Sequence, residues 1–228
     1  MLEVQNLTKV YPDGTVALRQ VSFTVQPGEF LVIIGLSGSG KSTLLRCINR
    51  LIEPTEGRIL WEGADITAAQ PAELRLIRRQ IGMIFQQFNL VRRSSVLTNV
   101  LTGRLGYLAA LPTLLHRFPA ETRRQAWQAL ERVGLADQAY KQARELSGGQ
   151  QQRVGIARAL MQQPHMILAD EPVASLDPVL AHSILGYLEE LNRKEGITVL
   201  CSLHSVSYTH LRAHETPEHL VCRLLLEK

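Results

Sequence analysis

The chain has 228 residues, of which 45% are hydrophobic and 20% charged, with a formal net charge of +4 and a pI near 9.1. This is enough apolar material for the core of one compact unit, and no run of about eighteen apolar residues that could span a bilayer is present. The arginines lack the interleaved aromatic residues that single-strand binding favours, so the composition argues against a membrane-spanning protein and against a nucleic-acid partner.

Strand-like segments open the chain. Leu2 to Thr8, Val16 to Val25 and Arg58 to Glu62 are predicted to form an antiparallel subdomain. Four further apolar runs predict a largely parallel sheet: Phe30 to Gly35, Ile81 to Phe85, Met166 to Ala169 and Thr198 to Ser202. Helices beginning at Lys41 and Pro178 are expected to pack on that sheet, which gives an α/β fold class.

A predominantly helical segment, about 95–157, is predicted to be inserted between these strands. Within it, four apolar residues at helical spacing form a stripe that indicates core packing: Ala126, Trp127, Leu130 and Val133. Cys47 and Cys201 lie outside any CxxC or metal-ligand pattern, so we expect both to be reduced core residues.

The first motif that carries chemistry lies between a predicted strand and a predicted helix. It comprises Gly35, Leu36, Ser37, Gly38, Ser39, Gly40, Lys41, Ser42 and Thr43. Its glycines allow the backbone to approach a polyphosphate, and the helix N-terminus presents N–H groups to it. Lys41 is expected to reach the phosphates, Ser42 to ligate Mg²⁺ and Thr43 to add a phosphate hydrogen bond. The alternative, a glycine-rich turn without a ligand, explains the complete pattern poorly.

Two adjacent carboxylates, Asp170 and Glu171, end the predicted strand that begins near Met166. Beside a magnesium triphosphate, Asp170 would hold the metal through its water shell. Glu171 would orient and deprotonate the attacking water. Without the phosphate-binding loop, a solvated acidic strand end would explain these residues equally well.

A second glycine-rich phrase follows far downstream, from Leu146 to Gln150, at the start of a predicted helix. It offers another helix N-terminus to an anion. A small-molecule kinase or a GTPase shares the first loop but does not require this phrase, which therefore disfavours those classes.

Together these motifs resemble the ATP-binding subunits of ABC transporters, from residue 2 to about 204. The resemblance implies a P-loop NTPase of ABC type with ATP and Mg²⁺ as its nucleotide and metal. In it, Tyr11 matches an adenine-stacking aromatic, although it could equally be a packing residue. Gln86 matches the glutamine that links the magnesium site to the membrane partner, and His204 matches the switch histidine at the γ-phosphate.

The resemblance also implies a homodimer with ATP sandwiched at its interface. Ser147, Gly148, Gly149 and Gln150 would then meet the nucleotide bound by the opposite protomer, and Asp177 would lie in a loop that crosses the interface. Transmembrane permease subunits would be direct partners, and an external substrate-binding protein an indirect one. The N-terminus lacks a leader sequence, so we expect a peripheral protein on the cytoplasmic face of the membrane.

Two stretches, 88–107 and 171–178, resemble the subgroup that imports phosphonate, phosphite or phosphate. The first lies where a coupling helix of the permease would dock. The alternative for this stretch is an amphipathic surface helix with incidental basic residues. An accessory subunit of a phosphonate-degrading enzyme assembly, without transport, is the alternative function, and a neighbouring permease gene would discriminate between the two.

The resemblance ends near Ser205. Val206 to Thr216 reads as the translation of a transposase sequencing adapter, and His219 to Lys228 as its flow-cell end. We therefore predict an ABC ATPase domain over 1–205 and a non-native tail over 206–228. Without the family's last strand and closing helices, one edge of the sheet is expected to be exposed.

Overall fold

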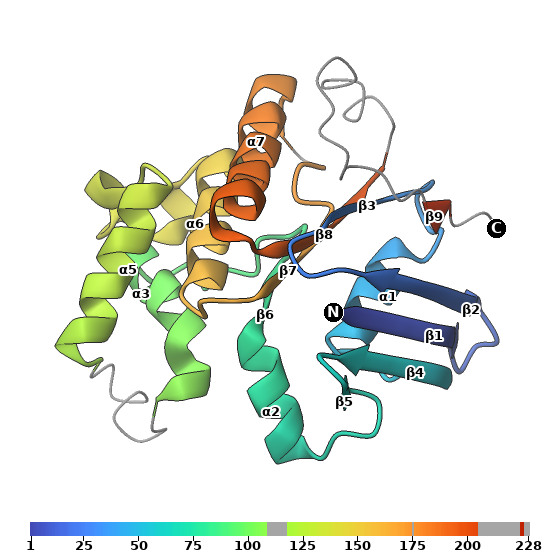
Figure 1. The fold of residues 1–228 in the computed structure, drawn as a ribbon. Coiled ribbons are helices and arrows are strands. Elements are labelled where there is room, and N and C mark those ends of the chain that lie inside the picture. The colour runs from blue at the N-terminus through green and yellow to red at the C-terminus, as the bar shows by residue number, and fades with distance from the viewer. Residues whose placement is uncertain (109–117, 175, 205–223, 226–228) are drawn as a thin grey trace.

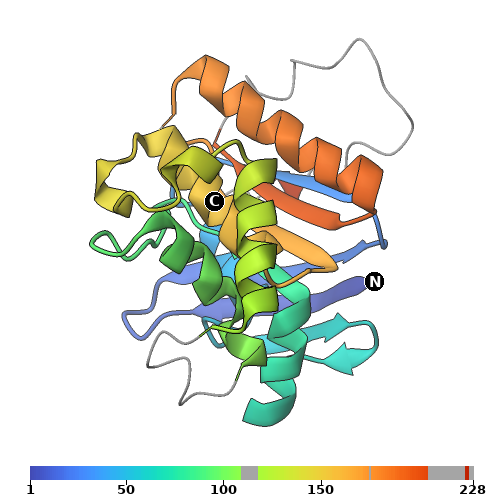
Figure 2. The ribbon, with the colours of Figure 1, turned by 90° about the vertical axis from the view of Figure 1, so that its left-hand side faces the viewer.

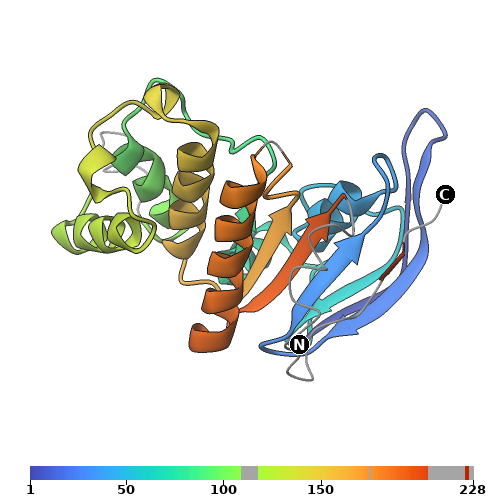
Figure 3. The same ribbon diagram turned by 90° about the horizontal axis from the view of Figure 1, so that it is seen from above.

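The computed structural model describes residues 1–108, 118–174, 176–204 and 224–225. Seen from above, helices gather at one end and an antiparallel sheet lies at the other, with the parallel strands and helix α7 (Pro178–Glu195) between them (Figure 3). This arrangement confirms the predicted combination of a parallel-sheet core, an antiparallel subdomain and a helical subdomain.

The antiparallel sheet has the order β2-β1-β4-β5. Its strands are β1 (Leu2–Val10), β2 (Val16–Val25), β4 (Glu56–Trp61) and β5 (Ala64–Asp65). Leu2, Val4 and Leu7 of β1 are buried with Leu44 and Leu45 of helix α1 (Lys41–Ile48), so the sheet packs on the helix that follows the glycine-rich loop. β5 has only two residues and no detectable sequence pattern.

The parallel sheet has the order β6-β7-β8-β3-β9 (Figure 1). Its strands are β3 (Phe30–Ile34), β6 (Ile81–Ile84), β7 (Met166–Asp170), β8 (Thr198–Leu203) and β9 (Leu224–Leu225). Every residue of β6, β7 and β8 is buried, as expected for parallel strands covered on both faces. Ile34 pairs with Leu203 and Asp170 with Ser202, so the carboxyl ends of β3, β7 and β8 meet at one edge.

The expected exposure of the sheet edge beside β3 is only partly met. Ile33 and Ile34 pair in parallel with Leu224 and Leu225, so the edge prediction is wrong for those two residues. The backbone groups of Leu224 and Leu225 thus pair with those of β3 that the open edge would otherwise leave unpaired. The rest of the predicted non-native tail, 206–223 and 226–228, lies outside the described residues.

Short helices make up the helical part, whose α5 helix lies towards the viewer in Figure 2. They are α3 (Val96–Leu101), η1 (Thr102–Tyr107), α5 (Ala120–Arg132), η2 (Ala136–Gln138), η3 (Ala143–Glu145) and α6 (Gly148–Leu160). Helix α2 (Pro71–Gln80) leads from the antiparallel sheet into β6. Three members of the predicted stripe are buried, but Trp127 is only half-buried and meets Tyr140 edge-on at 5.8 Å between ring centroids.

Candidate nucleotide-binding site

The loop between β3 and α1 has the backbone conformation that its glycines allow. Gly38 and Gly40 have φ of 76° and 94°, in the left-handed region. A Cβ atom at Gly40 would lie 2.2 Å from the carbonyl oxygen of Ala17, so no side chain fits there. Leu36 and Ser37 are exposed, which leaves the outer face of the loop accessible to a ligand.

The Lys41 ammonium is buried inside this loop, with only 3% of the residue exposed. It donates to the carbonyl oxygens of Gly35 (2.8 Å) and Leu36 (2.9 Å). It also lies 3.3 Å from a carboxylate oxygen of Glu171. The loop and the acidic strand end, which are 130 residues apart in sequence (171 − 41), are therefore joined at one positive charge.

Asp170 is fully buried at the end of β7. Ser42 Oγ donates to one of its carboxylate oxygens at 2.7 Å, and the Arg46 guanidinium donates to the other at 3.3 Å. A hydroxyl and a carboxylate beside a phosphate-binding loop are the oxygen ligands that Mg²⁺ prefers, so these residues fit the metal that the fold family implies. Arg46 was not predicted as a site residue, because only the folded helix α1 aims it at Asp170.

Glu171 follows with φ of 45°, a strained value for a residue with a side chain. Gln86 Nε2 donates to its second carboxylate oxygen at 3.1 Å, so the predicted glutamine and carboxylate are brought together. The backbone N–H of Glu171 donates to Ser202 Oγ at 3.0 Å. Sequence reasoning missed Ser202. Its only signal was a hydroxyl at the carboxyl end of a predicted strand.

Tyr11 lies beside the same loop. Its hydroxyl is 3.2 Å from Thr43 Oγ1, and the Lys9 ammonium lies 5.4 Å from the centre of its ring. The ring is half-buried. The stacking of adenine on Tyr11 stays a prediction.

The second glycine-rich phrase begins helix α6. Ser147 caps the helix, with Ser147 N–H donating to Gln150 Oε1 at 3.0 Å and Gln150 N–H donating back to the hydroxyl at 3.4 Å. Ser147 and Gly148 are exposed. Across the described residues, no hydrogen bond or ion pair joins this phrase to Lys41 or its loop. The site residues of one chain therefore form two separate groups.

Asp177 and His204 are both exposed. Asp177 caps helix α7 by accepting a hydrogen bond from Leu180 N–H at 3.0 Å. His204 follows β8 at the sheet edge where the loop and Asp170 also lie. Their roles at a nucleotide stay predictions.

The two cysteines are buried and free, as predicted. Burial raises the pKa of Cys47 to about 11. Burial and the neighbouring Asp170 raise the pKa of Cys201 to about 12, so both remain thiols at neutral pH.

Comparison with known proteins places this chain in a family. Residues 18–174 match the model of the ABC transporter family. The phosphonates import ATP-binding protein PhnC of Bacillus thuringiensis is 56% identical over 206 residues, covering 90% of this chain and 80% of that protein. PhnC 2 of Halalkalibacterium halodurans is 53% identical over 208 residues, covering 91% and 85%.

Comparison with solved structures indicates the same family. The dimeric structure of MJ0796, a bacterial ABC transporter cassette, superposes with a TM-score of 0.82 at 38% identity, covering 92% of this chain and 90% of that one. A post-hydrolysis state of the same cassette bound to ADP and Pi gives 0.81, with 91% and 90% covered. In the part of the chain that the structure describes, no helix has the length and apolarity needed to cross a membrane. The chain belongs to the ABC transporter family and has the fold of its ATP-binding cassettes.

Proposed function

We propose that this chain is the ATP-hydrolysing subunit that energises import of a phosphonate or a related phosphorus oxyanion through a membrane permease. The observation that carries the proposal is the convergence of Lys41, Gln86 and Glu171 beside the Ser42–Asp170 pair. Such a constellation supplies charge neutralisation, water orientation and a metal site, which are what phosphoryl transfer to water requires.

Each of these residues has a distinct role in ATP hydrolysis. Lys41 neutralises charge on the β- and γ-phosphates, for which it leaves its present carbonyl partners. Glu171 accepts the proton of the attacking water, and Gln86 fixes the orientation of that carboxylate. Ser42 and Asp170 would hold Mg²⁺, which supplies further neutralisation of the phosphate oxygens when bound.

The separation of the two glycine-rich phrases supports a site completed by two chains. Ser147 and Gly148 are exposed at a helix N-terminus, and within the described residues no hydrogen bond or ion pair joins them to the loop of their own chain. A second copy, arranged head to tail, would bring them to the γ-phosphate with Gln150 and Asp177, while His204 contacts the same phosphate from its own side. A relative with this fold is described as dimeric.

The names of the relatives support the transport substrate, since proteins more than half identical over most of this chain are called phosphonate import proteins. This favours a permease partner over an accessory role in a degrading enzyme. The protein would then be peripheral to the membrane, at its cytoplasmic face, with a substrate-binding protein as an indirect partner. We also retain the proposal of a catalytic domain over 1–205 and a non-native tail over 206–228.

Changing Glu171 to Gln tests the chemistry. Hydrolysis of ATP is expected to fall at least about 100-fold, because the base is lost, while ATP binding is kept. Phosphate release and equilibrium binding of a fluorescent ATP analogue measure the two properties. Glu190→Gln, at an exposed ion pair of α7, is the matched control and should keep full activity. Full hydrolysis by Glu171→Gln would contradict the assignment.

A further inference from the structure

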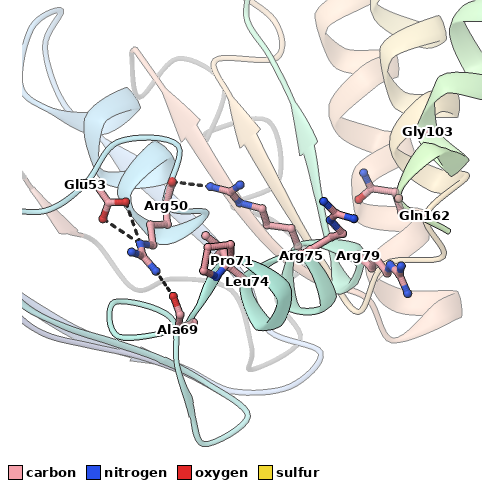
Figure 4. Close-up of a pocket in the computed structure, with 11 residues that line it drawn as sticks. Arg50, Glu53, Ala69, Pro71, Leu74, Arg75, Arg79, Gly103 and Gln162 are labelled. Carbon is pink, nitrogen blue, oxygen red and sulfur yellow. Dashed lines mark hydrogen bonds and ion pairs between the residues drawn. The ribbon is translucent and has the colours of Figure 1, made fainter. Parts of the chain in front are cut away.

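A polar pocket lies away from the nucleotide loop. It has a volume of about 570 Å³ and opens between α2, the end of α1 and η1. Arg50 and Glu53 come from one side, Arg75 and Arg79 from α2, and Gln162 from the helical side (Figure 4). With Arg78, four guanidinium groups line this pocket against the single carboxylate of Glu53.

Two of these arginines already have structural roles. Arg78 donates to the carbonyl oxygens of Asn49 (3.0 Å) and Arg50 (2.6 Å), and so ties α2 to the end of α1. Arg50 pairs with Glu53 and donates to the Ala69 carbonyl at 2.6 Å. Because carbonyl acceptors carry no net charge, these bonds leave most of the positive charge of the pocket uncompensated. Burial of Arg78, together with the nearby charge of Arg50, lowers the Arg78 pKa.

Two buried polar atoms of the lining lack hydrogen-bond partners within the described residues: Arg79 Nε, a donor, and Gln162 Oε1, an acceptor. Tyr107 holds their two segments together, because its hydroxyl lies 3.0 Å from the Arg79 carbonyl and 2.8 Å from the Gln162 carbonyl. The Arg79 guanidinium also lies over the Tyr107 ring at 4.9 Å. Unpaired buried donors and acceptors cost free energy, so a small movement of these two side chains that lets a ligand pair with both is favoured.

We infer that this pocket binds a protonated phosphorus oxyanion, of which inorganic phosphate is the simplest. Guanidinium groups match the oxygens of such an anion in both charge and geometry. At neutral pH, phosphate keeps at least one P–OH group. If the Arg79 and Gln162 side chains turn towards the pocket on binding, phosphate can accept from Arg79 Nε and Arg75 while donating to Gln162 Oε1.

The unpaired acceptor, Gln162 Oε1, discriminates between anions of similar charge. Sulfate and a carboxylate carry no proton at neutral pH, so either would leave Gln162 Oε1 unpaired or place negative charge against it. A site that requires a donor rejects an analogue lacking one because its buried polar group is then left without a partner. Phosphate is therefore preferred over sulfate and acetate.

Calorimetric titration of the Glu171→Gln protein, saturated with MgATP, tests the proposal. Occupation of the nucleotide site removes phosphate binding to the glycine-rich loop, whether or not ATP also causes dimerisation. Phosphate is expected to bind still, and more tightly than sulfate or acetate. Arg79→Gln and Arg75→Gln should each weaken phosphate binding about tenfold, since each removes a charge-assisted hydrogen bond. Gln162→Leu should abolish the preference over sulfate.

Arg193→Gln, which removes the same charge from an exposed position on α7, should leave phosphate binding unchanged. Arg75 is exposed, so its variant keeps the test valid if Arg79→Gln does not fold; circular dichroism melting checks both. Loss of phosphate binding on addition of MgATP would overturn the proposal. Equal phosphate affinity of the Arg75→Gln variant, the Arg79→Gln variant and the parent protein would also overturn it. Acetate binding as tightly as phosphate would overturn it in favour of a carboxylate site, such as one for an acidic side chain of a partner protein.

Discussion

Ser202 is the residue whose position most constrains the proposed chemistry. Its buried hydroxyl accepts from the N–H of Glu171 at 3.0 Å and lies 3.4 Å from a carboxylate oxygen of Asp170. Since Glu171 has a strained backbone, this bond helps to hold its side chain between Lys41 and Gln86. Ser202 is thus a positioning residue, acting through both carboxylates.

We predict that Ser202→Ala lowers kcat of ATP hydrolysis about tenfold, because one buried hydrogen bond contributes about 1–1.5 kcal/mol. KM for ATP should change little, since in the described residues Ser202 forms no direct hydrogen bond with the phosphate-binding loop. Ser202→Thr, which keeps the hydroxyl, should recover most of the rate. An unchanged kcat in the alanine variant, or equal loss in the threonine variant, would show that the hydroxyl does not position Glu171.

The conformation of the phosphate-binding loop requires a glycine at position 40. Gly40→Ala places a Cβ 2.2 Å from the Ala17 carbonyl oxygen at a φ of 94°, and should weaken ATP binding more than tenfold because the loop must shift. Gly14→Ala is the matched control, with φ of 85° and nothing within 4 Å of its Cβ. Equal ATP affinity of these two variants in a fluorescence titration would contradict the account.

At the scale of elements, two neighbouring glycines at the start of helix α6 have different surroundings. One packs against another helix, and the other is open to a ligand. A Cβ at Gly149 would lie 1.9 Å from Leu180 Cδ2, so α6 packs closely on the first turn of α7. A Cβ at Gly148 would meet nothing closer than 3.8 Å, and Gly148 is exposed. Both glycines belong to the predicted phrase, but they differ in what they contact within one chain.

Gly149→Ala is expected to destabilise the protein by about 1–3 kcal/mol through overpacking, whereas Gly148→Ala should leave the thermal midpoint unchanged. Gly148→Ala should still impair ATP-dependent dimerisation if this face meets the nucleotide of a second chain. Differential scanning calorimetry and gel filtration measure these outcomes. Equal midpoints for the two variants would show that α6 and α7 are less closely packed than described.

Most elements could be predicted because their apolar runs and loop signatures are local. The strand–loop–helix around Lys41 and the buried strand ending at Asp170 are examples. The contacts of Ser202, Arg46 and Arg78 could not, because each joins segments far apart in sequence whose approach depends on sheet order and helix packing. Similarly, β9 pairs through two residues that carry no strand pattern of their own.

At the scale of the whole molecule, the contribution of the chain end can be measured. β9 pairs with only two of the five residues of β3, so we expect removal of residues 206–228 to lower the thermal midpoint by no more than about 4 °C, with ATP binding kept. Calorimetry of the two chains provides the comparison. A much larger loss would show that residues 206–228 stabilise the fold, against the proposal that they are foreign to it.

The central claim is that one chain holds half of each nucleotide site, and that ATP therefore joins two chains. The most direct measurement is the mass of Glu171→Gln by light scattering after gel filtration, with and without MgATP. The account predicts a monomer without nucleotide and a dimer with it, and loss of that dimer in a second variant that adds Ser147→Arg on the exposed phrase. A monomer that binds MgATP fully, with no change in mass, would contradict the account.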